Sequence, residues 1–171
     1  MLIRVILADD HALLRDNLKL LLEGNGISVV GEAENGAVAV DLARSLHPHM
    51  VISDLSMPLM NGIETAAEIR KNLGIPTILL TTHSEEQYVL HAFQAGVAGY
   101  LLKSQAASDL VKAIHEVAHG NACLSPYISK VLIHKMLDED SSQDKMLTPR
   151  EREVLRLIAE GKWQWHSVWL T

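Results

Sequence analysis

The chain has 171 residues, of which 48% are hydrophobic and 21% are charged, and its formal net charge is -6. This composition excludes a disordered chain, and the acidic balance argues against nonspecific nucleic-acid binding by the chain as a whole. The sequence has no bilayer-length apolar run and no signal-peptide pattern, and the single cysteine, Cys123, cannot form an internal disulfide. We therefore expect a cytoplasmic globular protein without a membrane partner.

Short apolar runs alternate with amphipathic segments over the first 120 residues. The runs lie at residues 2–8, 28–34, 49–53, 77–81 and 98–102. Runs of this length without strict alternation predict strands buried on both faces of a parallel sheet. Between them, apolar residues recur at helical spacing. The alternation predicts an α/β fold with helices on both faces of a five-stranded parallel sheet, in the flavodoxin-like order 2-1-3-4-5.

Residues 122–147 are predicted to be a linker helix followed by an acidic linker. In "LSPYISKVLIHKML", Ser125 is a good N-cap and Pro126 suits the first helical position. The stretch "DEDSSQDK" that follows is polar and has no periodicity. We therefore expect a second, separate unit after the α/β domain.

That second unit is predicted to begin with a helix over residues 148–161. Thr148 and Glu151 form a capping box in "LTPREREVLRLIAEGK", and a glycine ends the pattern. Residues 162–171 then form an atypical tail that holds all three tryptophans of the chain. There are two interpretations of this tail. It packs on neighbouring apolar surface, or it is an unevolved extension that originates from a frameshift or from an artificial end of the chain. We expect the second origin, because its composition matches nothing upstream.

Three carboxylates follow two strands of the predicted sheet. Asp9 and Asp10 come directly after the first strand, and Asp54 follows the third. In the order 2-1-3-4-5 these strands flank the topological switch point, where open α/β sheets bind ligands. Clustered carboxylates remain ionised only with a cation among them, and oxygen ligands suit Mg²⁺. The sequence therefore predicts a magnesium site at this edge.

A hydroxyl and an ammonium follow the next two strands, at Thr81 and Lys103. Both groups suit contact with phosphoryl oxygens. A carboxylate nucleophile, a metal, a hydroxyl and a cation are what transfer of a phosphoryl group onto an aspartate requires. Asp54 is the best nucleophile candidate, because the turn "SDLSMP" would present its carboxylate at the strand tip. His11 and His83, in neighbouring loops, are candidates to tune this site.

Four blocks of the sequence resemble the signature blocks of bacterial response-regulator receiver domains. They are "VILADDHALLRDNLKLLLE", "VISDLSMPLMNGIE", "TILLTTHSEE" and "AGVAGYLLKS". The resemblance covers residues 1–121 and implies a CheY-like receiver domain over that range. It implies that Asp54 is the phosphoacceptor and that the Mg²⁺ ligands include the backbone carbonyl of Ser56. The remaining roles follow by position: Asp9 and Asp10 hold Mg²⁺, Thr81 and Lys103 contact the phosphoryl group, and Tyr100 is the aromatic switch residue.

The rest of the chain resembles the NarL/LuxR type of response regulator. Ser104 stands where many receivers have proline, as is common in this type. The segments "LSPYISKVLIHKML" and "LTPREREVLRLIAEGK" resemble its linker helix and the first helix of its helix-turn-helix domain. The last ten residues are too short for the two helices that should follow, and they hold one lysine and no arginine. DNA binding is therefore expected of a full-length form and is doubtful for this chain.

The resemblance implies a two-component response regulator that accepts a phosphoryl group from a sensor histidine kinase and changes its conformation and oligomerisation to control transcription. It is then a switch and not a turnover enzyme. The apolar face of the helix over 148–161 and the tryptophan tail predict either docking of the tail on its own chain or a homodimer, with or without exchanged C-terminal elements. The alternative is a truncated receiver that acts only as a dimerisation or kinase-sequestering module. Two other classes are disfavoured. A haloacid-dehalogenase-type phosphatase places its two working aspartates two residues apart after one strand, whereas Asp9 and Asp10 are adjacent and Asp54 follows the third strand. A flavodoxin needs a phosphate-cradling loop where this chain has "DDHALL".

Overall fold

The structure is a computed structural model that describes residues 2–139, without the side chains of residues 105–108 and 135–139. Three predictions lie outside the described residues: the acidic linker beyond residue 139, the helix over 148–161 with its capping box, and the tryptophan-rich tail. Within residues 2–139, no helix has the length and apolar character needed to cross a membrane.

A single parallel sheet of six strands forms the centre of the described part, in the order β2-β1-β3-β4-β5-β6. The strands are β1 (Ile3–Ala8), β2 (Ile27–Ala33), β3 (Met50–Ser53), β4 (Thr77–Thr81), β5 (Gly99–Leu102) and β6 (Cys123–Leu124). The fold class and the order 2-1-3-4-5 are confirmed for the five predicted strands. β6 was not predicted. Its two residues are too short to produce a strand pattern, and they lie in the range assigned to the linker.

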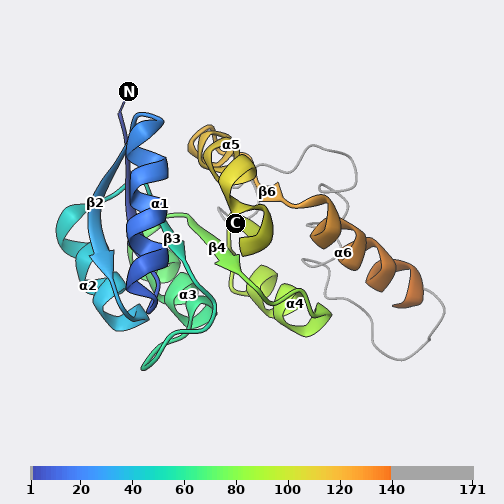
Figure 1. Ribbon diagram of the computed structural model, residues 1–171. Helices are drawn as coiled ribbons and strands as arrows, with labels where there is room; N and C mark the ends of the chain where they lie inside the picture. Colours follow the sequence, from blue (N-terminus) through green and yellow to red (C-terminus); the bar gives the residue numbers. More distant parts are fainter. Residues whose placement is uncertain (1, 140–171) are drawn as a thin grey trace.

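The helices cover both faces of this sheet, as predicted. They are α1 (Ala12–Gly24), α2 (Gly36–Leu46), α3 (Gly62–Leu73), α4 (Glu86–Gln94), the 3-10 turn η1 (Lys103–Gln105), α5 (Ala106–Ala118) and α6 (Pro126–Glu139). One core cluster packs α1 and α5 on the sheet through residues such as Leu22 and Ile114. The opposite face is covered by α2, α3 and α4. Figure 1 shows β6 and α6 at the opposite end of the molecule from β2 and α2.

The helix predicted after Ser125 is α6, and it is not isolated from the α/β domain. Ile128 and Leu132 are fully buried in the same core cluster as Val89 of α4. Ser125 is itself buried, and its hydroxyl accepts a long hydrogen bond from the amide of Ile128 at 3.4 Å. The sequence correctly indicated the N-cap and the helix, while the packing of α6 against α4 required the structure.

Candidate functional site

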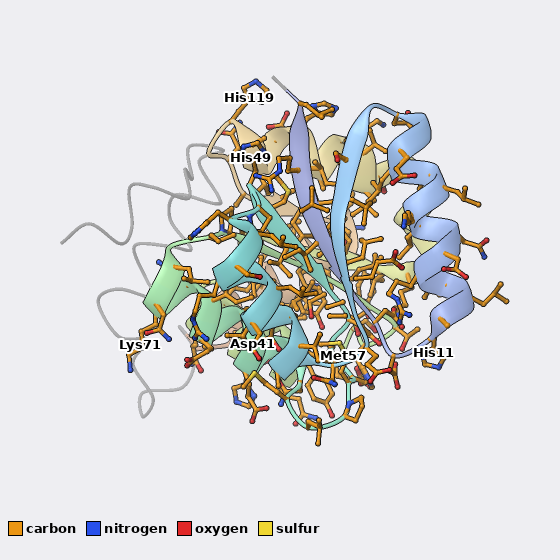
Figure 2. The ribbon with its side chains drawn as sticks, turned by 90° about the vertical axis from the view of Figure 1, so that its left-hand side faces the viewer. His11, Asp41, His49, Met57, Lys71 and His119 are labelled. Atoms are coloured by element: carbon orange, nitrogen blue, oxygen red, sulfur yellow. The ribbon has the colours of Figure 1, made fainter. Side chains whose placement is uncertain are left out.

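The strand order brings the predicted acidic residues together at the carboxyl ends of β1 and β3. The amide of Asp54 donates to the carbonyl of Ala8 at 2.8 Å, which fixes the end of β3 beside the end of β1. Asp9 and Asp54 are buried, at 3% and 6% exposure, whereas Asp10 is exposed. Ligand atoms of Asp9, Asp10, His11 and Asp54 all lie within 4.8 Å of one another. Figure 2 shows His11 and Met57 at this end of the molecule, opposite His49 and His119.

Lys103 joins the two buried carboxylates. Its Nζ lies 2.8 Å from Oδ2 of Asp9 and 3.0 Å from Oδ2 of Asp54. Its side chain is only 14% exposed, so this is a largely buried arrangement of one cation between two anions. The lysine is placed by η1, which begins directly after β5. The prediction that strands one, three and five supply one cluster is therefore matched by the geometry.

Burial and charge oppose each other at this cluster. Burial raises the pKa of the Asp54 carboxyl above its ordinary value, while the Lys103 ammonium beside it works in the opposite direction. Burial would by itself lower the pKa of Lys103. The hydrogen bonds and negative charges of Asp9 and Asp54 outweigh that effect and raise the pKa of Lys103. Lys103 is thus held as a cation, and it stabilises the ionised form of Asp54.

The turn after β3 holds the Asp54 carboxylate in place. Oδ1 of Asp54 accepts a hydrogen bond from the amide of Leu55 at 2.7 Å. The carbonyl of Leu55 accepts from the amide of Gly62 at 2.8 Å, which closes the loop. A Cβ atom at Gly62 would overlap the carbonyl oxygen of Asp54. The sharp turn predicted from "SDLSMP" is present, with Leu59 in the left-handed region at φ 66°.

Arg15 is a residue of the site that the sequence reasoning missed. Its Nη1 donates to the carbonyl of Asp9 at 2.6 Å, and its Nε lies 3.4 Å from Oε2 of Glu32. Lys19 also contacts Glu32, at 2.7 Å. These contacts tie the end of β1 to α1 and β2. No sequence pattern signals this contact, because it depends on where a long side chain ends.

Thr81 and Tyr100 are connected through the backbone of His83. The hydroxyl of Thr81 accepts from the amide of His83 at 3.1 Å, and the Tyr100 hydroxyl donates to the His83 carbonyl at 2.9 Å. Both Thr81 and Tyr100 are fully buried. The His83 ring reaches Oγ of Ser56 at 3.0 Å and lies 4.9 Å from the ring of Tyr88. His83 therefore links the β3–α3 loop, the β4–α4 loop and β5.

The donor set suits a hard divalent cation. Three carboxylates that converge at the switch point offer oxygen ligands, and the ligand preferences of Mg²⁺ match them. Asp10 is exposed and open to solvent, as the partly hydrated coordination of Mg²⁺ requires. His11 contacts Oδ1 of Asp10 at 2.9 Å through Nδ1 and can compete with a metal for this carboxylate. The residues present therefore fit the expected cofactor.

The fold and the site define the class: a flavodoxin-like α/β domain with an acidic, lysine-bridged site at its switch point. Comparison with known proteins agrees with this class. Residues 5–115 match the family described as the response regulator receiver domain. NarL, the nitrate/nitrite response regulator of Escherichia coli (strain K12), is 40% identical over 162 residues, which cover 92% of this chain and 75% of that protein. The transcriptional regulatory protein YdfI of Bacillus subtilis (strain 168) is 38% identical, over 92% of this chain and 76% of that protein.

Solved structures give the same result. A LuxR-family two-component response regulator from Aurantimonas sp. SI85-9A1 matches with a TM-score of 0.76 and 32% identity, over 80% of this chain and 99% of that one. The response regulator RcsB in complex with DNA matches with a TM-score of 0.73 and 31% identity, over 94% of this chain and 78% of that one. The chain therefore belongs to the two-component response regulators of the NarL/LuxR type, and the described residues include its receiver domain.

Proposed function

We propose that Asp54 accepts a phosphoryl group from a sensor histidine kinase and that this event switches the receiver domain. One observation carries the proposal: Lys103 bridges the buried carboxylates of Asp54 and Asp9 at 3.0 and 2.8 Å. A buried ion group of this kind is poor evidence for stability, because desolvation offsets its Coulomb energy. Its placement at the switch point of the sheet supports a chemical role.

Each residue has a defined part in the proposed reaction. An Oδ atom of Asp54 forms a bond to phosphorus while the bond from phosphorus to the donor nitrogen of the kinase histidine breaks, and the imidazole leaves. Lys103 orients Asp54 and, after transfer, pairs with a phosphoryl oxygen. The Thr81 hydroxyl donates to another such oxygen. Asp9, Asp10, Asp54 and the carbonyl of Ser56 would hold Mg²⁺, which neutralises charge that develops on the transferring group.

The proposal does not require turnover of a free substrate, because Asp54 is itself the acceptor. Hydrolysis of the acyl phosphate returns the chain to its starting state. RcsB has been solved in complex with DNA and, as an isolated receiver domain, with the phosphomimetic beryllofluoride. By analogy we assign this chain a role in transcription regulation through a changed conformation and a homodimer, with DNA binding doubtful for the chain alone. Action only by dimerisation or kinase sequestration remains the second candidate.

Acetyl phosphate with Mg²⁺ tests the site without the kinase. Intact mass spectrometry is expected to show one added phosphoryl group on the wild-type chain and none on Asp54→Asn. Asp41→Asn is the matched control, because Asp41 is an exposed carboxylate on α2. Phosphorylation of the Asp54→Asn chain would refute the assignment. Mg²⁺-dependent release of phosphate from a generic phosphomonoester would instead support an enzyme.

A further inference from the structure

A serine hydroxyl meets a histidine ring beside the proposed phosphorylation site. Oγ of Ser56 lies 3.0 Å from Nε2 of His83, although the two residues are 27 positions apart in the sequence. β3 and β4 are paired neighbours, so the loops that follow them leave the sheet at the same edge. Ser56 is exposed, and its hydroxyl is accessible to a molecule in solution. The proposed phosphoryl transfer uses only the backbone carbonyl of Ser56, so this side-chain contact has no part in it.

A carboxylate lies on the other side of the same ring. Nδ1 of His83 is 3.5 Å from Oε2 of Glu85, within ion-pair distance. The negative charge favours the tautomer that carries its proton on Nδ1, and Nε2 is then the acceptor for the Ser56 hydroxyl. A serine, a histidine base and a carboxylate that orients the base stand in the order that activates a serine in nucleophilic catalysis. Glu85 is the positioning residue of this group.

The His83 ring is held in this orientation by its own backbone and by a neighbouring aromatic ring. Its amide donates to the Thr81 hydroxyl at 3.1 Å, and its carbonyl accepts from the Tyr100 hydroxyl at 2.9 Å. The ring of Tyr88 lies 4.9 Å away at an angle of 51°. The His83 side chain is 32% exposed, so one part of the ring is covered and the other faces Ser56. The base is therefore in place before a substrate arrives.

A second exposed serine gives the comparison. The hydroxyl of Ser45 donates to the carbonyls of Asp41 and Leu42, at 3.0 and 3.2 Å. A carbonyl oxygen accepts a hydrogen bond but does not take the proton, so Ser45 keeps the low reactivity of an ordinary alcohol. A neutral imidazole can take the proton, and this is the difference at Ser56.

We propose that Ser56 is a nucleophile activated by His83 and that it forms an ester with an activated acyl group, such as the acyl group of a thioester. Oγ of Ser56 bonds to the carbonyl carbon while the hydroxyl proton passes to Nε2 of His83. The bond from that carbon to sulfur then breaks, and the sulfur leaves as a thiol with the proton from His83. The acylated serine is a second covalent site of the chain, and it does not depend on phosphorylation of Asp54.

Two probes test the site on the full chain, in EDTA and without a phosphoryl donor. With a fluorophosphonate, Oγ bonds to phosphorus as the bond from phosphorus to fluorine breaks, and the label stays attached. With a short-chain acyl thioester, the acyl group itself is transferred. Peptide mass spectrometry is expected to find both groups on Ser56 of the wild type and of Ser45→Ala, and neither on Ser56→Ala. Absence of the fluorophosphonate from Ser56 would overturn the nucleophile, and absence of the acyl group alone would overturn the substrate class.

Variants of the base and of the positioning residue test the mechanism. His83→Ala should slow fluorophosphonate labelling at least about tenfold, and added imidazole should restore part of the rate, which a merely structural role would not allow. His91→Ala is the matched control, because His91 is an exposed histidine of α4. Glu85→Gln keeps an acceptor opposite Nδ1 and should label faster than Glu85→Ala. An unchanged rate in His83→Ala, or no recovery with imidazole, would overturn the role of His83.

Discussion

Replacement of Lys103 by methionine is the perturbation that tests the site geometry most directly. Methionine keeps an unbranched side chain of similar length and removes the charge. Asp9 and Asp54 would then face each other without the cation that now lies 2.8 and 3.0 Å from their Oδ2 atoms. The variant therefore changes an ion triad into two buried like charges.

The distances give the size of the effect. At an effective dielectric constant of about 20, each of the two attractive pairs contributes about 6 kcal/mol of Coulomb energy. Desolvation of the three ions offsets most of this energy, and removal of one partner of a buried ion pair typically destabilises by about 3–5 kcal/mol. The side chains of Lys103, Asp9 and Asp54 are 14%, 5% and 6% exposed, so solvent screens the triad little. We expect a loss of about 3 kcal/mol at neutral pH without metal.

The loss should depend on pH and on Mg²⁺. Burial already raises the folded pKa of Asp54 above its unfolded value, and the Asp9 charge adds to the rise. Ionised Asp54 therefore opposes folding above its folded pKa, and this opposition disappears as the pH falls through that value. Without Lys103 the folded pKa rises further, so acidification should recover stability in the variant. Mg²⁺ at about 100 times its Kd adds about 2.7 kcal/mol to the free energy of unfolding of a folded chain that binds it. In the Lys103→Met variant, Mg²⁺ no longer competes with the lysine ammonium for the two carboxylates.

Urea unfolding followed by circular dichroism measures these quantities. The series compares wild type, Lys103→Met and Lys71→Met at neutral and mildly acidic pH, with and without Mg²⁺. Lys71 is an exposed lysine of α3 and is expected to change the free energy of unfolding by less than about 0.5 kcal/mol. A loss below about 1 kcal/mol for Lys103→Met, or a larger loss that neither acid nor Mg²⁺ reduces, would refute the reasoning.

Three further predictions concern other parts of the described fold. Gly62→Ala should destabilise by about 3 kcal/mol in urea unfolding, because its Cβ meets the Asp54 carbonyl, while Gly24→Ala, with open space around it, should stabilise by about 0.5 kcal/mol. Burial raises the pKa of the Cys123 thiol, so its alkylation at pH 8 should be slower in the folded than in the urea-unfolded chain. Arg15→Met should lower the free energy of unfolding by about 1.5–3 kcal/mol by loss of its charged hydrogen bond, and the Lys variant should lose less.

The sequence was most informative where a strand is long and buried on both faces. Residues 77–81 were predicted as a strand and are β4, because a continuous apolar run between turn residues has few other solutions. Asp9, Asp54 and Lys103 were placed at one site for the same reason, since parallel strands end at one edge. Strand order then determines which ends are neighbours, and only the structure supplies the bridging position of Lys103.

Two kinds of feature could not be predicted from the sequence: the contacts made by the end of a long side chain, and the pairing of a very short strand at the edge of the sheet. Arg15 contacts a backbone carbonyl of the site, and no periodicity indicates where a long side chain ends. β6 has two residues and forms because the main chain passes beside Gly99 and Tyr100. It makes two residues at the start of the expected linker a part of the sheet.

β5 connects the proposed phosphorylation site with the start of α6. Lys103 follows its last residue and holds Asp9 and Asp54, while Tyr100, three residues earlier, holds Ser125 through its carbonyl. A phosphoryl group on Asp54 adds negative oxygens beside the ammonium, so Lys103 must divide its contacts differently. The intervening strand pairs with β4 on one side and with β6 on the other. The residue that pairs with the proposed phosphoacceptor and the residue that anchors the start of α6 are therefore separated by only two residues of one paired strand.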